Sequence, residues 1–190
     1  MVRLIVGLGN PGRQYENTRH NVGFLVLDSL ASAYSAQWRN ESKFEGLTSE
    51  CNIDGVGFLL LKPQTYMNKS GSSVGKIARF YKISPEQIVV VHDELDFDVG
   101  VIKLKKNGGH AGHNGLRDII ANLGSGNFYR IRLGIGRPKP GCAVADYVLS
   151  CPSKIESEKL SSAIECGMNS IQQMAKIDLS ILMNQLNTIK

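Results

Sequence analysis

The chain has 190 residues, which is enough to bury one sizeable hydrophobic core and too few for two comfortable ones. Its hydrophobic share of 42% and its charged share of 21% are ordinary globular values, so composition excludes a disordered, fibrous or low-complexity chain. A net charge of +5 is compatible with a phosphate-bearing partner, but a solvated basic surface would give the same value.

The N-terminal apolar stretch covers only a few residues before glycines and polar groups follow, so it is too short for a signal peptide or a membrane span. The four cysteines are far apart and form no Cys-x-x-Cys pair; they are Cys51, Cys142, Cys151 and Cys166. This spacing is typical of neither a disulfide framework nor a zinc site. We therefore expect reduced thiols in a cytoplasmic protein that does not enter a membrane.

The first half of the chain predicts a strand, a polar loop and two helices around a hairpin. Residues 4–8 form an apolar run ended by glycine, which is typical of a buried strand, and a polar loop follows to about residue 21. Residues 44–62 predict a hairpin because two strand-like segments flank the turn dipeptide Asp54-Gly55. Helical spacing occurs twice, in Leu27, Leu30, Ala31 and Tyr34, and in Val74, Ile77, Ala78 and Tyr81.

The second half predicts three more strands and three more helices. Residues 88–91 are β-branched and apolar, as in a strand covered on both faces, and they are followed by His92, Asp93 and Glu94. Period-two alternation predicts strands at 101–105 and 129–136, and a glycine-rich loop at 108–115 leads into a helix. Ser153 and Glu156 form a capping box that begins a long helix, and the apolar tail from Leu179 to Leu186 predicts a last one.

Strands that alternate with helices along the whole length indicate an α/β fold. We expect a single domain over residues 1–190, with a mixed, largely parallel, twisted sheet flanked by helices. Ligand sites in such folds form at the carboxyl ends of the strands, where Asp93 lies.

Residues 7–12 match the dinucleotide-binding pattern Gly-x-Gly-x-x-Gly directly after a predicted strand. In a dinucleotide site the helix begins within the glycine turn and a carboxylate follows the next strand. Here about ten polar residues intervene, and Asp28 lies inside the helical stripe. We therefore reject a dinucleotide cofactor and expect a fixed turn that holds Asn10 at the strand end.

His20 and Asp93 are candidates for acid–base chemistry. His20 is predicted at the start of the first helix and outside its apolar stripe, where a lone histidine is more often a surface or capping residue than a base. A carboxylate at the end of a buried strand can, however, accept the imidazole N–H, fix its tautomer and raise its basicity. Neither residue is convincing without the other.

The glycine-rich loop carries His110 and His113, two potential metal ligands. Catalytic zinc needs three protein ligands and structural zinc four, and neither a Cys-x-x-Cys nor a His-Glu-x-x-His pattern accompanies them. We expect no metal, and we expect the loop to lead into a helix N-terminus that favours anions and oxyanions.

The sequence shows no nucleophile elbow, that is, no Gly-x-Ser-x-Gly turn directly between a predicted strand and a helix, and no pattern of an activated cysteine, which disfavours a covalent acyl-enzyme. The chemistry that remains is a histidine base that activates water, with amide groups placed to bind an oxyanion. A basic segment at residues 100–138 adds a candidate phosphate site; its charged residues are Lys103, Lys105, Lys106, Arg117, Arg130, Arg132 and Arg137 against Asp118 alone.

Several blocks of this sequence, in order and across nearly the whole chain, resemble the bacterial-type peptidyl-tRNA hydrolase family. The blocks are Gly7-Leu8-Gly9-Asn10-Pro11-Gly12 with Tyr15, Thr18-Arg19-His20-Asn21-Val22-Gly23-Phe24, Lys62-Pro63-Gln64-Thr65-Tyr66-Met67-Asn68-Lys69-Ser70-Gly71, the strand end at Asp93, Gly108-Gly109-His110-Ala111-Gly112-His113-Asn114-Gly115-Leu116-Arg117, and Arg132-Leu133-Gly134-Ile135-Gly136-Arg137-Pro138.

The resemblance implies an enzyme that hydrolyses the ester between a peptide and the 3′ ribose of tRNA, without a cofactor and as a monomer. It implies that His20 takes the proton of the attacking water, that Asp93 keeps His20 basic, and that Asn10 binds near the scissile carbonyl. It also implies a set of residues that contact tRNA or peptide, which are Tyr15, Tyr66, Asn68 and Asn114, with Met67 and His113 lining the cleft. Lys103, Lys105 and Arg132 resemble the family's clamp on the 5′ phosphate.

Two positions depart from the family pattern, since Tyr66 stands where phenylalanine is commoner and Lys69 where an apolar residue is usual. They affect the cleft rim and remove no catalytic group. The alternative is a non-catalytic RNA-binding module, which the basic strands support equally well. A short distance between His20 and Asp93 would favour the enzyme, and a wide separation would favour the binding module.

Overall fold

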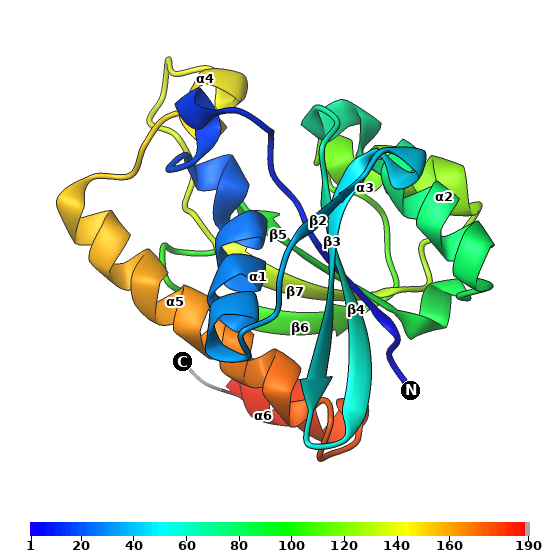
Figure 1. Cartoon of the computed structure of the whole chain (residues 1–190). Helices are drawn as coiled ribbons and strands as arrows, with labels where there is room; N and C mark the ends of the chain where they lie inside the picture. The colour runs from blue at the N-terminus through cyan, green and yellow to red at the C-terminus, as the bar shows by residue number, and fades with distance from the viewer. Residues whose placement is uncertain (189–190) are drawn as a thin grey trace.

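The computed structural model describes residues 1–188, and within them one seven-stranded sheet has the order β2-β3-β4-β1-β5-β7-β6 (Figure 1). The four central strands β4, β1, β5 and β7 are parallel, while β2, β3 and β6 pair antiparallel at the two edges. The expected mixed, largely parallel sheet is therefore confirmed. The strands are β1 (Leu4–Gly7), β2 (Arg39–Glu41), β3 (Gly46–Ile53), β4 (Val56–Pro63), β5 (Ile88–Glu94), β6 (Ile102–Lys106) and β7 (Tyr129–Gly134).

Helices cover both faces of this sheet (Figure 1). Helices α1 (Val22–Ala33), α5 (Lys154–Gln173) and α6 (Leu179–Thr188) pack on one face, and α2 (Ser70–Tyr81) and α3 (Asn114–Leu123) pack on the other. The short helix α4 (Val144–Val148) precedes α5. Within residues 1–188, no helix combines the length and apolar character that crossing a membrane would require.

Strand β5 lies at the centre of the sheet, as its continuous apolar sequence predicts. Val89 and Val91 belong to the core under α1 and α5, whereas Ile88 and Val90 belong to the core under α2 and α3. Both faces of β5 are covered, so the strand is buried as far as Asp93, which it places at its carboxyl end.

The N-terminal glycines serve helix packing and not a dinucleotide. A Cβ at Gly7 would lie 2.3 Å from the carbonyl oxygen of Gly23, and one at Gly23 would lie 2.4 Å from the Val91 oxygen. Only glycine therefore allows α1 to approach β1 and β5 this closely. Helix α1 begins at Val22, about ten residues beyond the glycine turn, which confirms the rejection of the dinucleotide fold.

Several details differ from the sequence-based expectation. His20 lies in a separate 3-10 turn, Arg19–Asn21, and Tyr34 follows the last residue of α1 instead of lying inside the helix. Strand β2 and helix α4 were not expected, since each is only a few residues long. The hairpin and the capping box of Ser153 and Glu156 are confirmed.

Candidate active site

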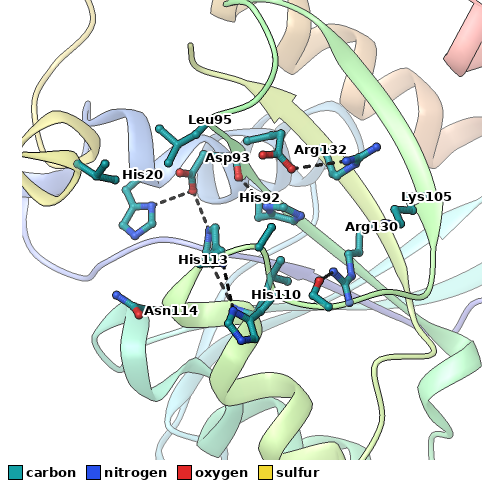
Figure 2. A pocket seen from close by; sticks show the side chains of 16 residues that line it. His20, His92, Asp93, Leu95, Lys105, His110, His113, Asn114, Arg130 and Arg132 are labelled. Atoms are coloured by element: carbon teal, nitrogen blue, oxygen red, sulfur yellow. Dashed lines mark hydrogen bonds and ion pairs between the residues drawn. The ribbon is translucent and has the colours of Figure 1, made fainter. Parts of the chain in front are cut away.

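His20 is buried, with 9% of its surface exposed, and it faces the carboxyl end of β5. Its Nδ1 lies 2.8 Å from Oδ1 of Asp93 (Figure 2). An ionised carboxylate can only accept a hydrogen bond, so Nδ1 carries the proton and donates a hydrogen bond to Asp93. The other ring nitrogen, Nε2, is left as a base. The interpretation of His20 as a surface or capping residue is thus wrong.

Burial and charge act in opposite directions on this pair. Burial lowers the pKa of His20, but the Asp93 charge and its hydrogen bond outweigh burial, so the pKa is raised above 6.5. Burial raises the pKa of Asp93, but His20 and His113 outweigh it and hold that pKa well below 3.8. Asp93 therefore remains a carboxylate at any physiological pH, as a partner that orients a basic imidazole must.

His113 is a second ring that binds the same carboxylate oxygen. Its Nε2 lies 3.0 Å from Asp93 Oδ1, and its Nδ1 accepts the Leu116 N–H at 3.3 Å. The accepted hydrogen bond places the proton on Nε2, which fixes the tautomer. His113 is thus the N-cap of α3. It already engages one of the helix N–H groups that we expected to be available for anions.

His92 is a buried residue of this site to which the sequence analysis assigned no role. Its Nδ1 donates to the Asp93 carbonyl oxygen at 2.6 Å, and its ring meets the His113 ring edge-on, with centroids 5.0 Å apart. Burial and the neighbouring His113 lower the pKa of His92 to about 3, so the ring is neutral. Strand alternation places His92 and Asp93 on opposite faces of β5, so the sequence pattern alone does not bring His92 into the site.

Asn10 is held in one orientation by its neighbours. Its Oδ1 accepts the Met67 N–H at 2.7 Å, and its backbone exchanges two hydrogen bonds with the Asn21 side chain, at 2.9 and 3.0 Å. Its Nδ2 donates to no group within residues 1–188, so this amide remains free for a ligand. Asn21 follows His20 directly, and the sequence analysis gave it no separate role.

The expected substrate residues lie in different places. His113 and Asn114 line the cavity that also contains His20 and Asp93 (Figure 2). Tyr66 and Asn68 are exposed beside α2, and Met67 is buried, with Sδ 2.6 Å from where a Cβ at Gly115 would be. Tyr15 is half-buried in the 3-10 turn Arg13–Tyr15. Within residues 1–188, the lining of this cavity does not include Asn10, Tyr15, Tyr66, Met67 or Asn68.

Positive charge gathers at the other end of the cavity, where Lys105 and Arg132 both line it (Figure 2). Arg132 Nη1 lies 3.6 Å from Glu94, and its guanidinium stacks 4.5 Å from the Phe97 ring. Lys103 lies directly opposite Arg132 in the strand register, but its Nζ is 5.7 Å from the Phe97 ring and the residue does not line the cavity.

Three side chains at the catalytic end have metal-ligand chemistry, since donor atoms of His20, Asp93 and His113 lie within 4.8 Å of one another. Zinc would need nitrogen donors about 2.0–2.1 Å away and pointing at the ion. Instead, His20 Nδ1 and His113 Nε2 both point at Asp93 Oδ1, and each donates a hydrogen bond to it. His110, the other potential ligand, accepts the Gly112 N–H at 3.1 Å and is not part of this group.

Comparison with known proteins identifies the family. The family model of peptidyl-tRNA hydrolase matches residues 4–190. The chain belongs to the peptidyl-tRNA hydrolase family. A peptidyl-tRNA hydrolase from Methylococcus capsulatus is 52% identical over 187 residues, which cover 98% of this chain and 100% of the relative. One from Dichelobacter nodosus is 53% identical over 174 residues, or 92% of each chain.

Solved structures agree with this assignment. The crystal structure of peptidyl-tRNA hydrolase from Acinetobacter baumannii matches with a TM-score of 0.94 and 44% identity, over 100% of this chain and 96% of that one. Family members are hydrolases that act on ester bonds. The 2.8 Å contact between His20 and Asp93 meets the geometric condition that favours an enzyme over a binding module.

Proposed function

We propose that this chain hydrolyses the ester bond between a peptide and the 3′ ribose of tRNA, with His20 as the general base. The observation that carries the proposal is the 2.8 Å contact between His20 Nδ1 and Asp93 Oδ1. A carboxylate can only accept, so Nδ1–H donates to Asp93 and Nε2 is left as the base. A base of this kind adjacent to a cavity activates water without a covalent intermediate. The family to which the chain belongs supports the substrate class.

In the proposed step, Nε2 of His20 takes a proton from water as the water oxygen bonds to the scissile carbonyl carbon. The tetrahedral intermediate then loses the 3′ oxygen of the ribose, which receives the proton from His20. The products are a peptide with a free carboxyl group and tRNA with a free 3′ hydroxyl group. Asp93 stabilises the imidazolium throughout and keeps its own negative charge.

Asn10 is proposed to donate from Nδ2 to the carbonyl oxygen as negative charge develops there. Its Oδ1 is fixed by the Met67 N–H, so the donor is oriented before the substrate binds. Met67 acts through this backbone contact. Because Asn10 would lie next to the C-terminal residue of the peptide, whose carboxyl group forms the ester, it would also help to distinguish a peptidyl group from a free amino acid.

The remaining polar groups are proposed to hold the substrate on both sides of the ester. Tyr15, Tyr66, Asn68, His113 and Asn114 would contact the tRNA end or the peptide. Lys105 and Arg132 would bind the 5′ phosphate, since arginine can grip a phosphate bidentately and lysine adds a point charge. Lys103 is assigned a weaker role, because its ammonium is directed toward Phe97.

We further propose that the 190-residue chain acts as a single domain, as a monomer without a cofactor or metal, in the cytoplasm. The substrate supports this location, because peptidyl-tRNA leaves the ribosome there when translation stalls or the peptide drops off. Release of free tRNA would return it to translation.

A hydrolysis assay with N-acetylated and free aminoacyl-tRNA tests the function. We expect rapid release of tRNA from the N-acetylated substrate and little from the free one. Binding of both tRNAs without hydrolysis of either would contradict the proposal and favour the RNA-binding module.

A further inference from the structure

Arg130 is a buried cation at the wall of the catalytic cavity, and the mechanism above does not use it. Only 2% of its surface is exposed, and it forms no ion pair within residues 1–188. Its guanidinium stacks 4.6 Å from the Phe128 ring and donates to backbone carbonyls only. Burying a charge without a counter-ion is costly, so the hydrogen bonds that the Arg130 guanidinium donates must offset this cost.

These contacts hold the start of the glycine-rich loop at residues 108–113. Nη1 donates to the Gly109 oxygen and Nη2 to the Gly108 oxygen, each at 2.5 Å, and Nη2 also reaches Gly126 at 3.5 Å. A planar guanidinium can donate to two successive carbonyls at once, which a lysine ammonium does less well. The loop needs such an anchor because Gly108, Ala111 and Gly112 all adopt positive φ, a conformation that few side chains favour.

The anchored loop touches both ends of the cavity. Downstream it ends in His113, whose Nε2 donates to the carboxylate of Asp93 at 3.0 Å. Upstream it lies against Lys105, because a Cβ at Gly108 would be 2.8 Å from Lys105 Nζ. Lys105 is also the residue directly opposite Arg130 in the pairing of β6 with β7. Figure 2 shows Arg130 between Lys105 and the histidines.

We propose that Arg130 is a positioning residue that fixes the 108–113 loop, so that His113 reaches Asp93 and Lys105 is aligned for the 5′ phosphate. The inference rests on the proposed function, in which Asp93 orients the base and Lys105 binds phosphate. Arg130 touches neither the reacting atoms nor the carboxylate of Asp93. It acts through the loop and through the register of the two strands.

The test is steady-state kinetics of the full chain on N-acetylaminoacyl-tRNA with and without its 5′ phosphate. Arg130→Lys keeps the positive charge and loses the planar guanidinium that donates to two carbonyls, while Arg130→Met loses both. Arg39→Lys, at an exposed position on the edge strand β2, is the matched control for replacing a guanidinium. We expect Arg130→Lys to lower kcat by about ten- to a hundredfold, since a displacement of about 1 Å in a catalytic group can cost about a hundredfold. The rise in KM on removal of the 5′ phosphate should become smaller than in the unaltered chain and in Arg39→Lys.

A double variant separates positioning from a general loss of structure. If Arg130 acts through His113, then Arg130→Lys combined with His113→Ala should have the kcat of His113→Ala alone, to within about twofold. Additive losses, an unchanged kcat, or a KM effect seen only in Arg130→Met would overturn the inference, the last by showing that charge alone matters. Unfolding of Arg130→Lys at the assay temperature would also overturn it, because Arg130 would then serve the stability of the fold.

Failure of the inference is distinguishable from failure of the proposed function. The unaltered chain must hydrolyse the N-acetylated substrate, and His20→Ala must not, before the Arg130 variants are compared. If the unaltered chain is inactive, the proposed function fails and the inference fails with it.

Discussion

The two ends of the cavity carry their charges in opposite ways. At the catalytic end, Asp93 is 3% exposed and a single oxygen accepts from two histidines at 2.8 and 3.0 Å. At the basic end, Lys105 is exposed, and the Arg132 side chain keeps 22% of its surface in solvent while its carboxylate partner lies 3.6 Å away.

This difference separates chemistry from binding. Buried and hydrogen-bonded charges are little screened by salt and do not reorganise, which suits the stabilisation of a transition state. Exposed charges are screened and mobile, which suits the capture and release of a polyanion. Changes at the catalytic end should therefore alter kcat, and changes at the basic end should alter affinity and its dependence on salt.

The largest expected effect is at His20. We expect His20→Ala to lower kcat by about two to four orders of magnitude, which is the usual contribution of general-base catalysis. Binding of tRNA should change little, because His20 is buried and lies apart from the basic end. Single-turnover hydrolysis and a tRNA-binding measurement on the same preparation check both parts, and near-normal turnover of the purified variant would exclude His20 as the base.

The pH dependence of kcat/KM should show an acid limb that reports His20. Since the pKa of His20 is raised above 6.5, the base is lost as pH falls through that raised value, and activity is retained above it. Asp93, with its pKa held well below 3.8, and His92, with a pKa of about 3, do not titrate in this window. The residual activity of His20→Ala should lack the limb, and an identical limb in that variant would assign it to another group.

A smaller effect is expected at the basic end, where Lys105→Ala and Arg132→Ala should weaken tRNA binding. Each lost phosphate contact should reduce the slope of log affinity against log salt by about 0.7 to 0.9. Lys106→Ala is the matched control, because Lys106 is the next residue of β6 and packs over Tyr129 without lining the cavity. Removal of the 5′ phosphate should mimic Lys105→Ala and leave that variant unaffected. Fully additive losses would place these residues elsewhere on the tRNA.

The sequence predicts the centre of this fold better than its periphery. Strand β5 is predictable because four successive β-branched residues must be covered on both faces. Strand β2, Arg39–Glu41, is polar and short and shows no alternation. Helix α4 is held by tertiary contacts that no local pattern reveals, such as the Tyr147 hydroxyl group donating to the Ile135 oxygen at 2.6 Å.

The site shows the same limit. The residues alone place Asp93 at a strand end, but its pairing with His20, 73 positions earlier, depends on how α1 packs, and the resemblance supplied it. The donation from His113 to Asp93 depends on a loop with positive φ at Ala111, a non-glycine conformation that the sequence does not predict. The sequence also does not predict the hydrogen bonds from Arg130 to the Gly108 and Gly109 carbonyls, because Arg130 is one of several basic residues in its segment.

The smallest expected effect is none at all, on removal of metal ions. His20, Asp93 and His113 bring three ligand atoms within 4.8 Å, and two histidines with one carboxylate can bind zinc or iron. Binding would require both ring nitrogens to lose their protons and turn from Asp93 Oδ1 toward an ion, and the Leu116 N–H opposes this by keeping the His113 proton on Nε2. We therefore expect EDTA to leave turnover unchanged and elemental analysis to find no stoichiometric zinc.

A zinc-dependent hydrolase treated in parallel shows that the chelator works. Added zinc should inhibit, because it would compete for the nitrogens that hold the base in place. One tightly bound zinc per chain that is essential for turnover would instead make these side chains ligands, and the catalytic end would then act through a metal-bound water.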